Sequence, residues 1–161
     1  MKAPTSGGWE FAVVDLDGTL ANTDHRAHHV AKIGFRNFEA FYNEMDKDTV
    51  NPWCLALVKS LIKNQIIVVL LSARPKRYDV QTIQWLDDQG LMAAMADGWV
   101  RLRLLGRDDH TPDHHLKQEW LNKHPDHRAS ILFAVDDRPR VISMWRKEGV
   151  TCLDCGTWRA P

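Results

Sequence analysis

The feature that most constrains the fold is an unbroken run of branched apolar residues at positions 66–71, IIVVLL. A run without polar alternation is typical of a parallel strand that is covered on both faces. Further strands are expected at 11–14, 100–104, 131–135 and 150–153. Helical patterns lie between these runs and begin at Asn51-Pro52, Pro75, Thr111-Pro112 and Pro139. The sequence therefore predicts an α/β fold, with a central parallel sheet and helices on both faces.

Residues 22–50 interrupt this alternation. They carry aromatic and apolar side chains at helical spacing, namely Phe35, Phe38, Phe41, Tyr42 and Met45. Two interpretations stay open, a helix that packs on the core and a small cap-like insertion beside the mouth of a site. The length of 161 residues fits one domain. We therefore expect a single domain over 1–161, in which 22–50 is a small helical insertion.

Composition excludes some function classes. Lys+Arg and Asp+Glu are both 21, and this zero formal net charge argues against indiscriminate coating of nucleic acid or an anionic membrane. A local basic cluster could still bind one phosphorylated end. Three cysteines argue against a disulfide framework, and the N-terminus lacks the apolar core of a signal peptide. We expect a cytoplasmic protein without membrane contact, and homo-oligomerisation stays open.

Polar residues follow three of the predicted strands directly. They are Asp15 and Asp17 after the first strand, Ser72 and Arg74 after 66–71, and Asp136 and Asp137 after 131–135. Sites in parallel sheets lie beyond the carboxyl ends of the strands. We therefore expect these side chains to meet in one crevice.

The pair Asp15 and Asp17 could divide the work of phosphoryl transfer. One aspartate can be a covalent nucleophile. A second, with a raised pKa, can protonate the leaving oxygen and later activate water. Close carboxylates repel unless a cation lies between them, and oxygen ligands suit Mg²⁺. The alternatives are a solvated Asp-Gly turn at 17–18 and helix capping by Asp136 before a proline.

Asp113 and Lys117 are four residues apart, so they share one helix face. Alone they favour an ordinary surface ion pair. Together with the acids and the strand-end residues, they complete the set that phosphoryl transfer needs: a nucleophile, an acid, a metal and cations on the phosphate oxygens.

In order along the chain, Asp15-x-Asp17-Gly18-Thr19, Ser72, Lys117 and Asp136-Asp137 resemble the four motifs of haloacid dehalogenase (HAD) phosphatases. The resemblance implies a three-layer Rossmann-like fold, phosphorylation of Asp15 and general acid/base catalysis by Asp17. It implies phosphate binding by Ser72 and Lys117. It also implies Mg²⁺ binding by Asp15, Asp136 and the Asp17 backbone carbonyl, with Thr19 in support. Asp137 is then expected to orient Lys117 or metal-bound water.

Over nearly its whole length the chain also resembles the 3′-phosphatase domain of phage-type polynucleotide kinase-phosphatase. The matching segments are 13–21, 50–52, 67–74 and 134–152. The resemblance adds Arg26, Arg74 and Asp113 to the substrate-binding residues. Arg26 is expected to reach over the phosphate, Arg74 to bind a second oxygen, and Asp113 to hold Lys117 or Arg74.

The chain departs from that family at some positions. Ala73, beside Ser72, stands where the family has glycine, and the stretch 104–111, which includes Arg107, matches poorly. No G-x-x-x-x-G-K-[ST] loop occurs, so we expect a phosphatase domain without the kinase half.

Histidines, cysteines and tryptophans give weaker signals. His110 and His114 are expected to face the substrate, and a transition-metal site that includes His115 is the alternative. The pair Cys152 and Cys155 favours packing over zinc or redox chemistry. Among the tryptophans, the core is expected to hold Trp53, Trp85, Trp120 and Trp145, whereas Trp99 and Trp158 could stack on a base.

The sequence thus favours Mg²⁺-dependent hydrolysis of a phosphate monoester on a nucleotide or on a nucleic-acid 3′ end. A phosphatase of 5′-mononucleotides or other small metabolites is the alternative within the same chemistry. A phosphate-binding module without turnover is the alternative from another class.

Overall fold

The computed structural model describes residues 2–3, 9–32, 34–106 and 109–156. Its five-stranded sheet has the order β5-β4-β1-β6-β7, and every neighbouring pair is parallel. The strands are β1 (Phe11–Val14), β4 (Ile67–Pro75), β5 (Val100–Gly106), β6 (Ile131–Asp136) and β7 (Cys152–Asp154). The predicted α/β class with a parallel sheet is confirmed.

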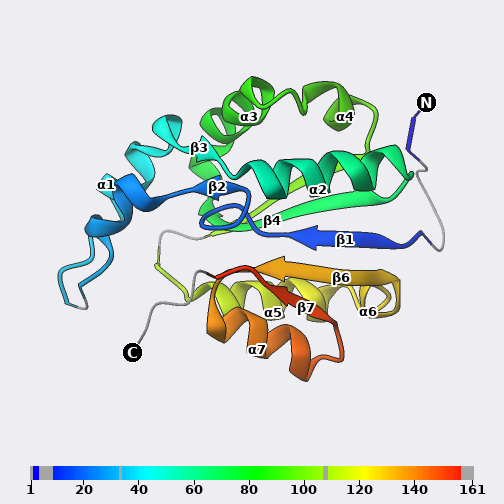
Figure 1. Ribbon diagram of the computed structural model, residues 1–161. Coiled ribbons are helices and arrows are strands. Elements are labelled where there is room, and N and C mark those ends of the chain that lie inside the picture. Colours follow the sequence, from blue (N-terminus) through cyan, green and yellow to red (C-terminus); the bar gives the residue numbers. More distant parts are fainter. Residues whose placement is uncertain (1, 4–8, 33, 107–108, 157–161) are drawn as a thin grey trace.

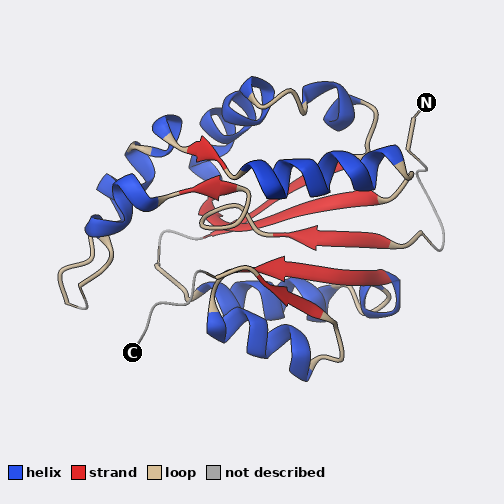
Figure 2. Ribbon diagram, viewed as in Figure 1, coloured by secondary structure: helices blue, strands red, loops and turns tan. Residues whose placement is uncertain are grey.

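Helices cover both faces of this sheet and give the molecule three layers (Figures 1 and 2). One face carries α2 (Pro52–Lys63), α3 (Asp79–Asp88) and α4 (Met92–Ala96). The other carries α5 (Asp113–Lys123), α6 (His127–Ser130) and α7 (Pro139–Lys147). No helix among the described residues is long and apolar enough to cross a membrane.

Two apolar clusters hold the layers together, one on each face of the sheet. Successive residues of β1 alternate between them, so Val13 packs with Trp145 of α7 while Val14 packs with Val58 of α2. Burial on both faces explains why the strands read as continuous apolar runs. Trp85, Trp120 and Trp145 lie in these clusters, as predicted.

The segment between β1 and α2 is more broken than the single amphipathic helix that its aromatic spacing suggests. It comprises β2 (Ala21–Asn22), the 3₁₀ helix η1 (Asp24–His29), α1 (Phe38–Asn43), the 3₁₀ helix η2 (Met45–Lys47) and β3 (Thr49–Val50). The strands β2 and β3 form an antiparallel ribbon, and the segment lies beyond the carboxyl ends of the sheet strands (Figure 1). Phe41 and Met45 are buried, but Phe35 is 76% exposed.

Several local predictions were wrong. The strand β4 continues through Pro75 and is followed by the 3₁₀ helix η3 (Lys76–Tyr78), so the next helix begins only at Asp79. Trp53, at the first turn of α2, is 47% exposed, whereas Trp99 is buried in the core and offers no open ring face. Arg107 lies outside the described residues, and so does Trp158, for which base stacking was considered.

Asn51 precedes α2, but its side chain makes no capping hydrogen bond to the helix. Instead, its Nδ2 donates to the carbonyl of Thr19 at 2.7 Å. The start of α2 is therefore tied to the loop after β1.

We expect Leu86→Ala to lower the free energy of unfolding by about 2–5 kcal/mol, because the side chain is fully buried where α3 covers the sheet. Val80→Ala on the same helix is the control. Its side chain is 77% exposed, so the change should stay within about 0.5 kcal/mol. Urea unfolding measures both, and equal losses would contradict the packing of α3 described above.

Candidate active site

Three carboxylates meet at the carboxyl ends of the central strands β1 and β6. Asp15 follows β1, and its backbone N–H donates to the carbonyl of Val135 at 3.1 Å, which holds it beside β6. Asp136 ends β6 and Asp137 follows it. Ligand oxygens of these three acids lie within 4.8 Å of one another. The expected convergence of two strand-end acidic pairs therefore holds for Asp15, Asp136 and Asp137.

Lys117 of α5 lies between two of these acids. Its ammonium donates to Asp15 Oδ1 at 2.7 Å and to Asp136 Oδ2 at 2.6 Å, and the residue is only 1% exposed. Burial alone lowers the lysine pKa, but its ion pairs with Asp136 and Asp15 raise it above the ordinary value. Lys117 is therefore a fixed positive charge beside Asp15.

Asp15 itself has a pKa well above its ordinary value. Burial is the largest cause, and the negative charges of Asp136 and Asp137 add to it, while Lys117 opposes it. The hydroxyl of Thr19 also donates to Asp15 Oδ2, at 3.3 Å. One ammonium thus only partly offsets three crowded carboxyl groups.

The donor chemistry of this acidic cluster fits Mg²⁺. Asp137 Oδ1 is buried without a hydrogen-bond partner among the described residues, and burial raises the Asp137 pKa to about 6. Gly18, with φ of +87°, makes room for this acid, since a Cβ there would meet Asp137 Oδ2 at 2.2 Å. A cation among hard oxygen ligands would relieve both the crowding and the unpartnered oxygen. Lys117 pairs with Asp15 and Asp136, and no bond from it to Asp137 occurs among the described residues.

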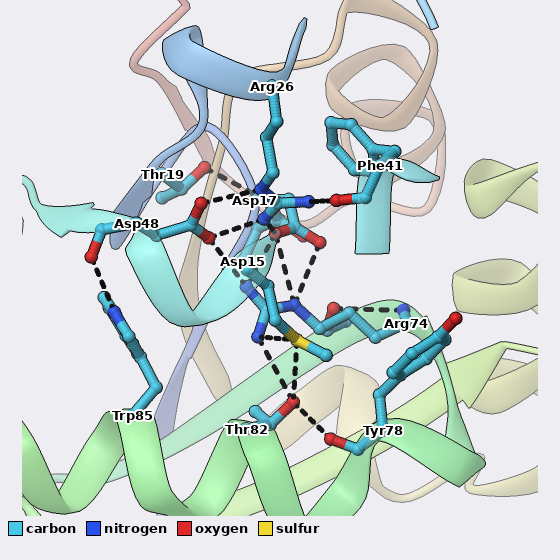
Figure 3. Close-up of polar contacts among 12 residues, drawn as sticks. Asp15, Asp17, Thr19, Arg26, Phe41, Asp48, Arg74, Tyr78, Thr82 and Trp85 are labelled. Atoms are coloured by element: carbon cyan, nitrogen blue, oxygen red, sulfur yellow. Dashed lines mark hydrogen bonds and ion pairs between the residues drawn. The ribbon is translucent and has the colours of Figure 1, made fainter. Parts of the chain in front are cut away.

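The side chain of Asp17 belongs to a different cluster (Figure 3). Its Oδ1 accepts from Arg26 Nη2 at 2.6 Å and from Arg74 Nη2 at 2.7 Å, and Arg74 Nε donates to Oδ2 at 3.1 Å. Burial alone raises the Asp17 pKa, but Arg74 and then Arg26 lower it below its ordinary range. The sequence predicted a raised pKa for this aspartate, and that prediction was wrong because both arginines face inward.

Asp48 was not predicted from the sequence, although its side chain is fully buried in the same cluster. It accepts from Arg26 Nε at 2.6 Å and from Arg74 Nη2 at 3.3 Å (Figure 3). Trp85 Nε1 donates to its backbone carbonyl at 2.8 Å. No pattern in the sequence marks Asp48, because its role arises from the burial of two guanidinium groups that need more than one counter-charge.

Arg26 and Arg74 are both 0% exposed. Arg26 Nη1 donates to the carbonyl of Phe41 at 3.0 Å, and the guanidinium lies 4.0 Å from the centre of the Phe41 ring. Arg74 Nη1 donates to Thr82 Oγ1 at 3.2 Å. In this structure both arginines hold Asp17, and neither lies on the cavity lining. That Arg26 reaches over the phosphate stays a prediction.

A cavity of about 510 Å³ opens over these two clusters. Asp15 and Asp17 lie on its lining together with Ser72 and Ala73 of β4. Ser72 Oγ accepts from the backbone N–H of Arg74 at 3.1 Å, which fixes the hydroxyl at the end of the strand. The cavity therefore brings the predicted nucleophile, acid and phosphate-binding hydroxyl to one space.

Asp113 lines the same cavity but has a different partner from the predicted one. It accepts from Arg138 Nη1 at 3.0 Å, and in the described part of the chain no bond joins it to Lys117 or Arg74. His110 and His114 also line the cavity, while His115 is exposed. Cys152 is buried, as expected for a packing residue.

Asp48→Asn is expected to lower the free energy of unfolding by about 3–5 kcal/mol, because it leaves two buried guanidinium groups with one carboxylate. Catalytic efficiency should fall as well, since the arginines position Asp17. The control is Asp46→Asn on the exposed side of η2, which should stay within about 0.5 kcal/mol. Urea unfolding and kcat/KM are the measurements. Wild-type stability of Asp48→Asn would mean that Asp17 alone satisfies both arginines.

The fold resembles those of several solved structures. A chain of the Pnkp1/Rnl/Hen1 complex matches with a TM-score of 0.69 and 24% identity, covering 94% of this chain and 47% of that one. A chain of the Pnkp1/Rnl/Hen1 RNA repair complex gives 0.66 and 22%, covering 98% and 47%. The present chain thus spans about half the length of each. A HAD family enzyme of Bacteroides thetaiotaomicron, solved with magnesium and inorganic phosphate, gives 0.56 and 13%, covering 95% and 97%.

The family of the chain follows from a match of another kind. The sequence model of the polynucleotide kinase PNKP phosphatase domain matches residues 10–157, which is nearly the whole chain. This match agrees with the fold and with the acidic cluster at the ends of β1 and β6. The chain is therefore a HAD phosphatase that belongs to the family of PNKP phosphatase domains.

Proposed function

We propose that the protein hydrolyses phosphate monoesters on the 3′ ends of nucleic acids or on nucleotides, through an aspartyl-phosphate on Asp15. The observation that supports this most is the setting of Asp15 on the lining of the cavity. Lys117 contacts it from behind at 2.7 Å, and Ser72 and Ala73 lie on the same lining. The ammonium of Lys117 favours the ionised form of Asp15, which is the form that attacks phosphorus, against the effect of burial.

In the proposed reaction, an Asp15 oxygen attacks phosphorus and the ester P–O bond breaks. Asp17 gives its proton to the leaving oxygen. Water then attacks the aspartyl-phosphate, passes a proton to Asp17, and leaves Asp15 free with inorganic phosphate. Because Arg26 and Arg74 lower the pKa of Asp17, it holds a proton only if the bound phosphate draws one arginine away.

Mg²⁺ fits beside Asp15, and its ligands in this proposal are Asp15, Asp136 and the backbone carbonyl of Asp17. The Asp17 side chain is committed to the arginines, so only its carbonyl is available. When bound, the ion would neutralise charge on the phosphate oxygens. Asp137 then orients metal-bound water, and Ser72 donates to a phosphate oxygen.

The nucleic-acid substrate is the finer part of the proposal. It is supported by the family match and by the likeness to chains from a complex described as an RNA repair complex. A cavity of about 510 Å³ suits a nucleotide-sized group. The insertion at 22–50 then acts as a small cap over a single domain. A phosphate-binding module without turnover is disfavoured, because the nucleophile, acid and lysine are all present.

A substrate panel tests this function. We expect the protein with Mg²⁺ to release phosphate from p-nitrophenyl phosphate and, with higher kcat/KM, from 3′-phosphorylated oligonucleotides. Asp15→Asn should abolish both activities, because an amide is a very poor nucleophile. Far better hydrolysis of sugar phosphates than of any nucleotide or oligonucleotide would contradict the proposed substrate class. Turnover by folded Asp15→Asn would contradict the mechanism.

Metal binding can be measured without turnover. We expect Asp136→Asn to weaken Mg²⁺ affinity at least about tenfold in calorimetric titration, since even outer partners of metal ligands matter this much. Asp154→Asn is the control, because Asp154 ends the neighbouring strand β7 as the register partner of Asp136. Equal Mg²⁺ affinity in both variants would mean that Asp136 is no metal ligand and only bonds with Lys117 and the Arg138 N–H.

A further inference from the structure

The outer part of the cavity carries a pair of stacked rings. Phe38 of α1 and His110 of the loop after β5 have centroids 4.9 Å apart and planes inclined by 21°. These residues come from segments far apart in the sequence, and both line the cavity that holds Asp15 and Asp17. His110 has φ of +57°, a left-handed conformation that costs energy for a residue other than glycine. The ring pair is therefore a defined part of the cavity lining.

Two cations lie on the same lining, and the ring pair together with these cations is called the rim below. Arg36 and Arg140 line the cavity and are exposed. Within 2–3, 9–32, 34–106 and 109–156, neither guanidinium has a hydrogen-bond or ion-pair partner. This sets them apart from Arg138, which is paired with Asp113. Exposed guanidinium groups without a counter-charge are suited to bind phosphate.

We propose that this rim is a subsite for the nucleoside that carries the transferred phosphate and for the phosphodiester on the 5′ side of that nucleoside. The base stacks on the Phe38–His110 pair, and Arg36 and Arg140 bind the phosphodiester. The two rings are already in stacking contact, so the base adds to the outside of the pair. This subsite rests on the proposed function, and it implies a preference for a dinucleotide or longer strand over a mononucleotide.

Other phosphate monoesters that the same chemistry could hydrolyse would use only part of this rim. A sugar phosphate offers neither a flat ring nor a second phosphate. A nucleoside 3′-monophosphate offers the ring but no phosphodiester. A strand with a 3′-phosphate offers both, and it leaves through the open mouth of the cavity, where Arg36 and Arg140 lie exposed.

The ring pair is tested by comparing kcat/KM for p-nitrophenyl phosphate with that for a 3′-phosphorylated dinucleotide. In Phe38→Ala, kcat/KM for the dinucleotide divided by kcat/KM for p-nitrophenyl phosphate should fall by about tenfold or more, the usual effect of losing one base stack. Phe38→Leu keeps the apolar bulk of α1 and should show the same fall. Phe35→Ala is the matched control, because this exposed ring on the same insertion does not line the cavity.

The arginines are tested by comparing the dinucleotide with the nucleoside 3′-monophosphate. In the double variant Arg36→Gln and Arg140→Gln, kcat/KM for the dinucleotide should fall about tenfold more than kcat/KM for the nucleoside 3′-monophosphate. Lys32→Gln removes a positive charge from the same insertion without changing the cavity lining, so the ratio of its two kcat/KM values should stay at the wild-type value.

The outcomes separate the subsite from the function. If the wild-type protein hydrolyses the dinucleotide and the Phe38 variants lose equally on every substrate, the subsite is wrong and the proposed function stands. If it hydrolyses p-nitrophenyl phosphate but no nucleotide, the proposed substrate is wrong and the subsite with it. A loss in Phe35→Ala equal to that in Phe38→Ala would overturn the assignment of the ring pair.

Discussion

The buried charge cluster around Asp17 is the interaction on which the site depends. Arg26 and Asp48 belong to the insertion, whereas Arg74 belongs to β4 of the sheet (Figure 3). Burying any one of these charged groups alone would cost roughly several kcal/mol. Two guanidinium groups that face two carboxylates compensate each other's charge. Because each partner needs the others, the insertion can take only the position that completes the cluster. The cluster therefore fixes the insertion over the ends of the strands.

This cluster also explains how two aspartates separated by one residue come to differ chemically. Asp15 faces other acids and one lysine, and its pKa is raised, mainly by burial. Asp17 faces two arginines, and its pKa is lowered. The turn at Gly18, which only a residue tolerant of positive φ adopts at low cost, follows both acids and brings the chain past Asp137. Opposite electrostatic settings at neighbouring positions favour different roles in one reaction.

The sequence predicted the sheet well because its signals are local. The strand β1 was predicted to the residue, and the acids that follow β1 and β6 meet because parallel strands end on one side. The helical insertion after β1 was predicted, but the aromatic spacing did not reveal that its backbone forms several short pieces. The role of Asp48 and the burial of Arg26 depend on how the insertion folds, so no local sequence pattern could reveal them.

The insertion consequently has two roles that are physically linked. It supplies Arg26 and Asp48 to the cluster that sets the charge of Asp17, and it supplies Phe38 and Arg36 to the cavity. Phe41 connects the two, because its carbonyl and ring contact Arg26 while its side chain lines the cavity. A ligand that presses on α1 therefore acts on the arginine that holds Asp17. In the proposed mechanism, binding of the substrate beyond its phosphate and release of Asp17 for proton transfer would depend on the same few contacts.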